Sequence, residues 1–166
     1  MRVRSVLNSV VALLLLSLLV SCGFHLRGSA NLPDSLKSLF VQGIDIRQGL
    51  GLELKRGLMR NGVTVLAQYK QGGAVLTVMD NHFERRVLSV GADAKVSEYE
   101  LYGTMTYKVS NSYGVEVSPA QKIEARRDYQ FDQNQILAAD EEERLLRVQL
   151  DQQLVQTLLR RLSVLK

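Results

Sequence analysis

The residue best placed for covalent chemistry is Cys22, the only cysteine among the 166 residues of the chain. It follows Leu19-Val20-Ser21 at the end of an apolar run from about Val10 to Val20. Two arginines precede the run, and a positive start, a short apolar middle and a small residue at the cut are typical of a secretory signal. A thiol directly after the small residue indicates cleavage before Cys22 and acylation of its sulfur.

The apolar run is shorter than the roughly 20 residues that cross a bilayer core of ~30 Å. Two other interpretations of this segment stay open: an ordinary secreted protein that starts with cysteine, and a short anchor helix. Gly23, and not aspartate, follows Cys22, which by the usual bacterial sorting rule favours the outer membrane. Two or more acyl chains hold a protein stably, at ~0.8 kcal/mol per buried methylene. We therefore expect a lasting lipid tether on the periplasmic side of the outer membrane.

Residue types that could catalyse a reaction are few. His25 lies close to the expected anchor, and His82 has no nearby cysteine and no histidine at helical spacing, so neither belongs to a spaced metal motif. No Gly-x-Ser-x-Gly sequence or phosphate loop occurs. We expect a binding protein with no catalytic residue, no metal site and no cofactor.

Two carboxylates and several cations could instead form charge pairs. Glu98 and Glu100 project to one face of a predicted strand, where pairing with Lys122 or Arg126 on a neighbouring strand is favoured over acid–base work. The basic residues that could bind phosphate groups by charge-assisted bonds are Arg85, Arg86, Arg126, Arg127 and Lys95. Neighbours on a strand point to opposite faces, so only one member of each arginine pair can join a common surface. A solvated strand face is the alternative for each of these cations.

The elements that position these residues follow from hydrophobic periodicity. Short strands are predicted over Ser38–Val41 and Val63–Leu66. Apolar residues recur at every fourth position from Gln48 to Arg60, which predicts a helix, and Asn61-Gly62 is a plausible stop. Ala74–Val90 is a longer, less regular run, and we expect a strand interrupted near Asp80-Asn81.

Two strands alternate clearly, Ser97–Ser110 and Ile123–Phe131, with their odd-numbered apolar positions inward. Residues that face each other across the pair share a face, so the connecting loop has an odd length. We expect a three-residue loop, Ser112-Tyr113-Gly114, with Gly114 in the left-handed conformation.

A final helix is expected to begin at Asp140, which would cap a first turn of three glutamates, and to end near Arg160 and Arg161. Its apolar stripe consists of Leu146, Leu150, Leu154, Leu158 and Leu162, widened by Val155 and Leu159. Two amphipathic helices can bury their apolar stripes against a sheet that has one apolar face. The fold class expected is α+β, a two-layer sandwich of a mixed, mostly antiparallel four-to-five-stranded sheet with two helices on one face.

The domain organisation expected is a cleaved signal peptide over 1–21, a lipidated N-terminus and linker over 22–36, and one domain over 37–166. Cleavage would remove Arg2 and Arg4, and the remaining chain is close to neutral. Charge therefore gives no support to nucleic-acid binding, and none is expected.

Motifs along the mature chain carry a family resemblance. The sequence Cys22-Gly23-Phe24-His25-Leu26-Arg27-Gly28 with Leu32-Pro33, then Ser97-Glu98-Tyr99, then Phe131-Asp132-Gln133-Asn134-Gln135 and Leu137-Ala138-Ala139-Asp140-Glu141-Glu142, resembles the LptE (RlpB) family of lipopolysaccharide-assembly lipoproteins. The N-terminal heptapeptide is the most specific of these motifs.

The resemblance implies a partner role without enzymatic activity. Members of this family sit in the lumen of the outer-membrane β-barrel LptD as plug and folding aid, and the pair delivers lipopolysaccharide to the outer leaflet. The family also binds lipopolysaccharide through basic residues, and Lys95, Arg85 and Arg86 are the candidates here. Relatives can carry a lysine where this chain has Ala138-Ala139. The alternatives are a free-standing periplasmic lipid-binding lipoprotein and a pilot lipoprotein for another outer-membrane assembly.

Overall fold

The structure is a computed structural model that describes residues 32–70 and 73–165. The predicted signal sequence, Cys22 and His25 lie outside the described residues. The described elements are a short 3-10 turn η1 (Asp34–Leu36), strand β1 (Ser38–Gln42), helix α2 (Gly49–Arg60), β2 (Thr64–Leu66), β3 (Ala74–Val90), β4 (Val96–Ser110), β5 (Glu116–Gln130), a second 3-10 turn η2 (Gln133–Gln135) and helix α3 (Ile136–Leu162).

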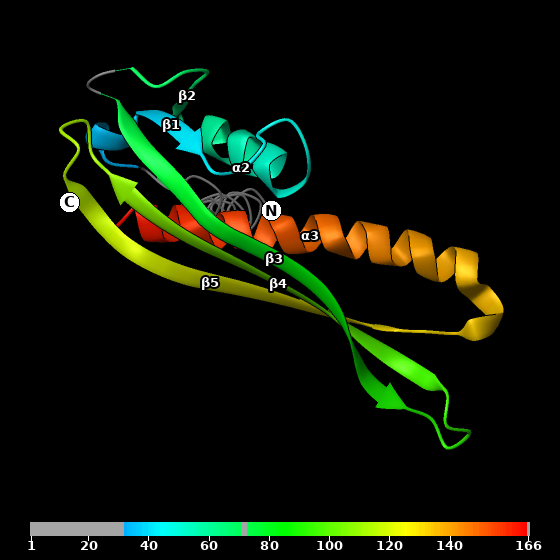
Figure 1. Cartoon of the computed structure of the whole chain (residues 1–166). Helices are drawn as coiled ribbons and strands as arrows, with labels where there is room; N and C mark the ends of the chain where they lie inside the picture. The colour runs from blue at the N-terminus through cyan, green and yellow to red at the C-terminus, as the bar shows by residue number, and fades with distance from the viewer. Residues whose placement is uncertain (1–31, 71–72, 166) are drawn as a thin grey trace, which may run out of the picture.

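The strands form one mixed five-stranded sheet in the order β2-β1-β3-β4-β5. β1 runs parallel to β2 and β3, whereas β3, β4 and β5 are antiparallel. Both helices pack on one side of the sheet, and the β3–β4 hairpin extends past the start of α3 (Figure 1). The predicted α+β fold with a mixed sheet and two helices is confirmed.

The core lies between the helices and the odd-numbered face of β4 and β5, where alternation places the apolar side chains. The stripe of α3 from Leu150 to Leu162 is buried as predicted, together with Leu101, Met105, Tyr107 and Ile123 of the sheet. α2 and α3 approach closely because Gly57 has no side chain: a Cβ there would lie 2.5 Å from Cγ1 of Val155. Leu32 and Leu36 also belong to this core.

The β4–β5 connection forms the predicted three-residue loop. The amide of Asn111 donates to the carbonyl of Val115 over 2.8 Å, and Gly114 has a φ of 76°. Odd residues face odd residues as far as Tyr107 opposite Gln121, and register shifts next to the loop then place Val109 opposite Ser118. The helix stop at Asn61-Gly62 is also confirmed, with a φ of 76° at Gly62.

Two predictions about element boundaries are wrong. Asp140 does not cap the last helix, because α3 begins at Ile136 and Asp140 lies inside it. The capping carboxylate is Asp132, which accepts from the amide of Asn134 over 2.8 Å at the start of η2. β3 is a continuous strand from Ala74 to Val90, and its irregularity is a register shift between Val78 and Asp80 that does not end the strand.

Candidate functional site

The first candidate cation, Arg85, lies on the helix-facing side of β3 and is already paired. Its Nη1 lies 2.8 Å from Oε2 of Glu143 on α3, and the same oxygen accepts the Tyr129 hydroxyl over 2.6 Å. The guanidinium stands 4.5 Å from the ring centroid of Tyr99. Arg85 therefore ties the sheet to α3.

The contacts of Arg85 and Tyr129 shift the pKa values of both side chains. The hydrogen bond to Glu143 raises the pKa of Arg85 above its ordinary value. Burial, then the hydrogen bond to Glu143, raises the pKa of Tyr129 to about 12. Tyr129 stacks on Tyr99 with a centroid separation of 5.8 Å. These residues are a structural cluster on the covered face of the sheet.

The second candidate, Arg86, lies on the opposite, solvent-facing side of the sheet, as the strand geometry predicted. It pairs with Glu84 and lies 3.6 Å from a carboxylate oxygen of Glu100. Its guanidinium stacks 4.0 Å from the ring centroid of Tyr102, and Arg126 approaches the same ring at 5.2 Å. The tyrosine is thus held between two cations.

Carboxylates balance the cations of this outer-face network. Arg126 lies 3.9 Å from Glu100 and 3.2 Å from Glu124, and the Tyr102 hydroxyl donates to Glu124 over 2.7 Å. The hydrogen bond from Tyr102 lowers the pKa of Glu124. The predicted pairing of Glu100 with Arg126 is confirmed. Glu98 instead accepts from Ser89 over 2.9 Å, and within the described residues no ion pair joins either Glu98 or Glu100 to Lys122.

The third candidate, Lys95, lies in the turn between β3 and β4 and is the most accessible of the three. Its side chain is 60% exposed, and its Nζ lies 3.9 Å from Asp93. The three predicted cations therefore do not form one cluster: Arg85 and Arg86 occupy opposite faces, and Lys95 lies at the hairpin tip.

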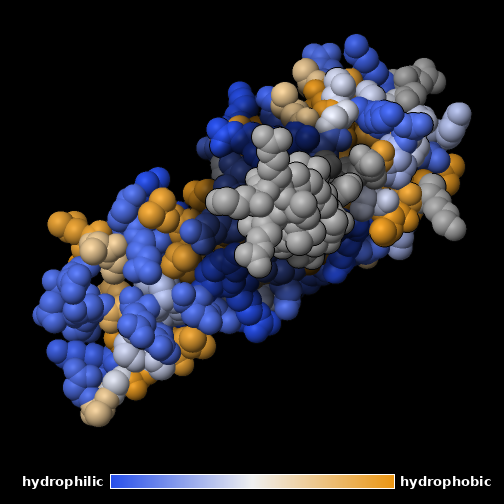
Figure 2. Space-filling model, turned by 180° about the vertical axis from the view of Figure 1, so that it is seen from behind, coloured by the Kyte–Doolittle hydropathy of each residue, from blue (hydrophilic) through white to orange (hydrophobic). Residues whose placement is uncertain are grey.

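Sequence reasoning missed the apolar surface near this tip. Val87, Leu88 and Val90 are each at least half exposed, and Ile136 and Leu137 at the start of α3 are exposed as well. Figure 2 shows hydrophobic residues mixed with hydrophilic ones at the narrow end of the molecule. The signal was present in the sequence, because Val87, Leu88 and Val90 fall where the alternation of β3 is broken.

The described residues contain neither a cluster of metal ligands nor a helix that could span a membrane. Over 32–70 and 73–165 no three His, Cys, Asp or Glu side chains converge as a metal site. Within the same ranges no helix has both the length and the apolarity to cross a membrane. The fold and the site together define an α+β sandwich whose open sheet face carries paired charges. A fold of this kind does not by itself assign a function.

Comparison with known proteins gives the family. The model of the family described as "LptE: Lipopolysaccharide-assembly" matches residues 36–162. The chain belongs to this family of non-enzymatic lipopolysaccharide-assembly lipoproteins.

Individual relatives agree with this assignment. The chain is 30% identical to the LPS-assembly lipoprotein LptE of Photorhabdus laumondii over 93% of this chain and 86% of that protein. It is 27% identical to the protein of the same name from Pectobacterium atrosepticum, over 85% and 76% of the two chains. The solution structure of lipoprotein B from Nitrosomonas europaea superposes with a TM-score of 0.69 at 25% identity, over 85% of this chain and 90% of that one.

Proposed function

We propose that this protein is anchored at the periplasmic side of the outer membrane by a lipid on Cys22. Residues 1–21 are then the cleaved signal, residues 22–36 the lipidated linker and residues 37–166 the single domain. Support comes from the apolar run that ends at Cys22 and from the family match over residues 36–162.

The partner in this proposal is an LptD-type outer-membrane β-barrel, in whose lumen the domain acts as plug and assembly partner. The supporting observation is the long β3–β4–β5 ribbon, whose outer face carries a charge network that includes Arg86, Tyr102 and Arg126. A paired polar face can enter a hydrated lumen without burying an uncompensated charge.

Direct lipopolysaccharide binding is the second part of the proposal. Phosphate groups favour accessible cations, and Lys95 at the hairpin tip and Arg86 on the outer face remain candidates on that ground. Arg85 is a weaker candidate because it faces the helices and is held there by Glu143 and Tyr99, whereas Arg86 and its partners Glu84 and Tyr102 lie on the open face of the sheet. The exposed Val87, Leu88 and Val90 beside the tip offer an apolar surface for acyl chains.

A free-standing periplasmic lipid carrier is the alternative, and it needs an enclosed apolar cavity. The pocket between α2, β3 and α3 has a volume of about 260 Å³ and is lined by both polar and apolar residues. Drug-sized ligands occupy roughly 300–1,000 Å³, so a lipid with several acyl chains exceeds this pocket. This pocket therefore gives no support to the carrier.

Co-purification of the full-length protein from outer membranes tests the proposal. We expect a stoichiometric complex with a large barrel that resists SDS, and a lipidated Cys22 by mass spectrometry. Lys95→Glu and Arg86→Glu should each weaken lipopolysaccharide binding several-fold, whereas Arg85→Glu should mainly destabilise the fold. Recovery of only a free monomer would argue for the carrier, and unchanged lipopolysaccharide binding would remove Lys95 and Arg86 from the site.

A further inference from the structure

β1 leaves the sheet early and exposes one edge of β3. β1 pairs with β3 only from Leu39 opposite Ala74 to Gln42 opposite Thr77. The chain then turns away at Gly43, which has a φ of 86°. A Cβ built on Gly43 would clash with the carbonyl oxygen of Val78, so a residue with a side chain does not fit there. From Met79 to Val90, no described strand pairs with β3 on this side. An unpaired edge is a template for a further strand.

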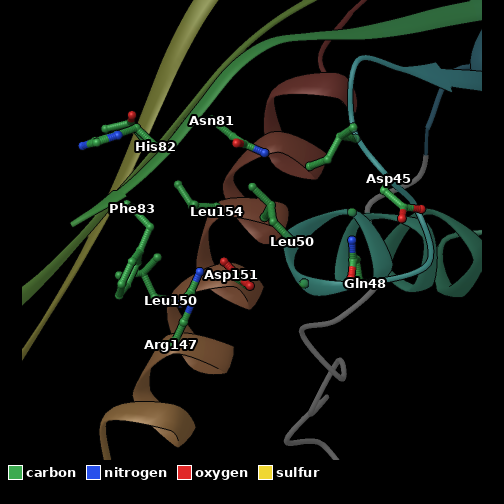
Figure 3. A pocket seen from close by; sticks show the side chains of 15 residues that line it. Asp45, Gln48, Leu50, Asn81, His82, Phe83, Arg147, Leu150, Asp151 and Leu154 are labelled. Carbon is green, nitrogen blue, oxygen red and sulfur yellow. The ribbon is translucent and has the colours of Figure 1, made fainter. Parts of the chain in front are cut away.

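A pocket opens beside this free edge. It lies between the start of α2, residues 81–83 of β3 and the middle of α3, and its volume is about 260 Å³. Leu50, Leu150, Leu154 and Phe83 supply apolar walls, as Figure 3 shows, and Asp151 and Arg147 reach into it from α3. The pocket thus lies beside the part of β3 that β1 does not cover.

Asp151 is the acidic group of this pocket that has no hydrogen-bonded or ion-paired partner among the described residues. No hydrogen bond or ion pair reaches its carboxylate within the described residues, although the residue is partly buried. Burial raises the pKa of Asp151 to about 6, opposed by the charge of Arg147 and reinforced by that of Glu53. A half-buried, unpaired carboxylate gains most from an incoming cation.

The neighbouring charges leave Asp151 available. Glu53 of α2 already bonds Arg56 over 2.7 Å. Arg147 stacks over Phe83, with 4.1 Å between the guanidinium carbon and the ring centroid. Arg147 is exposed, so its side chain can move into solvent when another cation enters. Asp45 at the rim is bonded to Arg47.

We propose that an extended, basic segment of a partner protein adds to the open edge of β3, and that one of its lysine or arginine side chains enters the pocket and pairs with Asp151. In this mode of recognition main-chain hydrogen bonds supply affinity and a side-chain pocket supplies specificity. The inference rests on the proposed function only in requiring a protein partner. It assigns to this edge a docking role separate from the cations considered above.

A polypeptide fits this site better than a free amine because two features are adjacent. The edge of β3 offers backbone groups over residues 79–83, and alternate side chains of an added strand point to one face. The pocket lies on the helix-facing side of the same residues, where Asn81 and Phe83 contribute to its lining. A strand laid on the edge can therefore place one side chain in the pocket.

Two synthetic peptides test the proposal on the full-length protein in detergent by heteronuclear NMR. One is the acetylated amide TVTKTVT, and the other replaces its lysine with norleucine, which keeps the apolar stem and removes the charge. We expect the lysine peptide to shift the amides of residues 79–83 together with the side chain of Asp151, and to bind at least tenfold more tightly than the norleucine peptide. Asp151→Asn should abolish that preference.

Matched controls separate the outcomes. Glu142→Gln removes an exposed carboxylate from the same helix and should leave the preference for lysine unchanged. Equal binding of the two peptides, or shifts confined to other surfaces, would overturn the proposal. Binding of n-butylamine at Asp151 with no peptide response at residues 79–83 would overturn the strand addition. Either negative result, obtained while the barrel still co-purifies, would leave the proposed function standing.

Discussion

Gly103 on β4 lies directly against Leu150 on α3. A Cβ built on Gly103 would fall well inside contact distance of Cδ2 of Leu150, and Leu154 lies 3.4 Å away. The absence of a side chain at this position of β4 therefore lets α3 pack close to the sheet. Interiors are packed densely enough that one added methyl group must displace a neighbour.

The first prediction concerns this contact. Gly103→Ala should lower the free energy of unfolding by about 1–3 kcal/mol, because overpacking displaces α3. Chemical denaturation monitored by circular dichroism gives the value. The loss should become smaller in a Leu150→Ala background, where room for the new methyl exists. A Gly103→Ala cost that is the same in both backgrounds would contradict the proposed clash.

The second prediction concerns the tie between β3 and α3. Arg85→Gln should cost about 1 kcal/mol of stability, because the Glu143 carboxylate loses a charged donor at a partly buried site. Arg144→Gln is the matched control, since Arg144 pairs with Glu141 in an exposed position on α3. Its cost should be near zero in the same denaturation experiment. Equal costs for the two variants would show that the Arg85 pair contributes no more than a surface ion pair.

The third prediction concerns stability at alkaline pH. The pKa of Tyr129 is raised from 10 to about 12, so the unfolded tyrosine ionises first as pH rises. The stabilising contribution of the Tyr129 hydroxyl to the free energy of unfolding is complete below pH 10 and is lost as the pH approaches 12. Tyr129→Phe should be less stable than the parent at neutral pH, and the difference should narrow above pH 10. Tyr113→Phe, at an 87% exposed position, should show no such narrowing.

The fourth prediction concerns the half-buried carboxylate of Asp151. Asp151 has a pKa of about 6 against 3.8 for the ordinary value, so folding with Asp151 charged is penalised above pH 6. The penalty declines as pH falls through 6 and vanishes below 3.8. Asp151→Asn should therefore stabilise the protein by about 1–2 kcal/mol near neutral to mildly alkaline pH. Denaturation across this range should show the gain shrinking toward acid, and a constant gain would contradict the assigned pKa.

Most of the fold was predictable from the sequence because its signals are local. The alternation over Ser97–Ser110 determined which face is buried, and the parity of that alternation required an odd loop before Gly114 was seen in its left-handed conformation. The start of α3 was not predictable in the same way. Asp140 has good capping chemistry, but Asp132 provides the observed cap at η2 and the helix continues from there.

The candidate site was predictable only in part, because it depends on contacts between distant segments. Strand geometry correctly separated Arg85 from Arg86. The partner of Arg85 is 58 residues away on α3, and no local pattern reveals it. Asp151 was equally hidden, since its position on an amphipathic helix indicates exposure, and only the departure of β1 at Gly43 reveals the pocket beside it.

The length of β4 has a consequence for how far this protein can reach. Its 15 residues span about 50 Å at ~3.3 Å per residue, which exceeds the ~30 Å hydrocarbon thickness of a bilayer. The blue segment at the start of the described chain and the β3–β4 turn lie toward opposite ends of the molecule (Figure 1). A domain moored at the inner leaflet and inserted turn-first would carry Lys95 to the depth of the outer-leaflet headgroups. One continuous hydrogen-bonded ribbon would then reach from one surface of the membrane to the other.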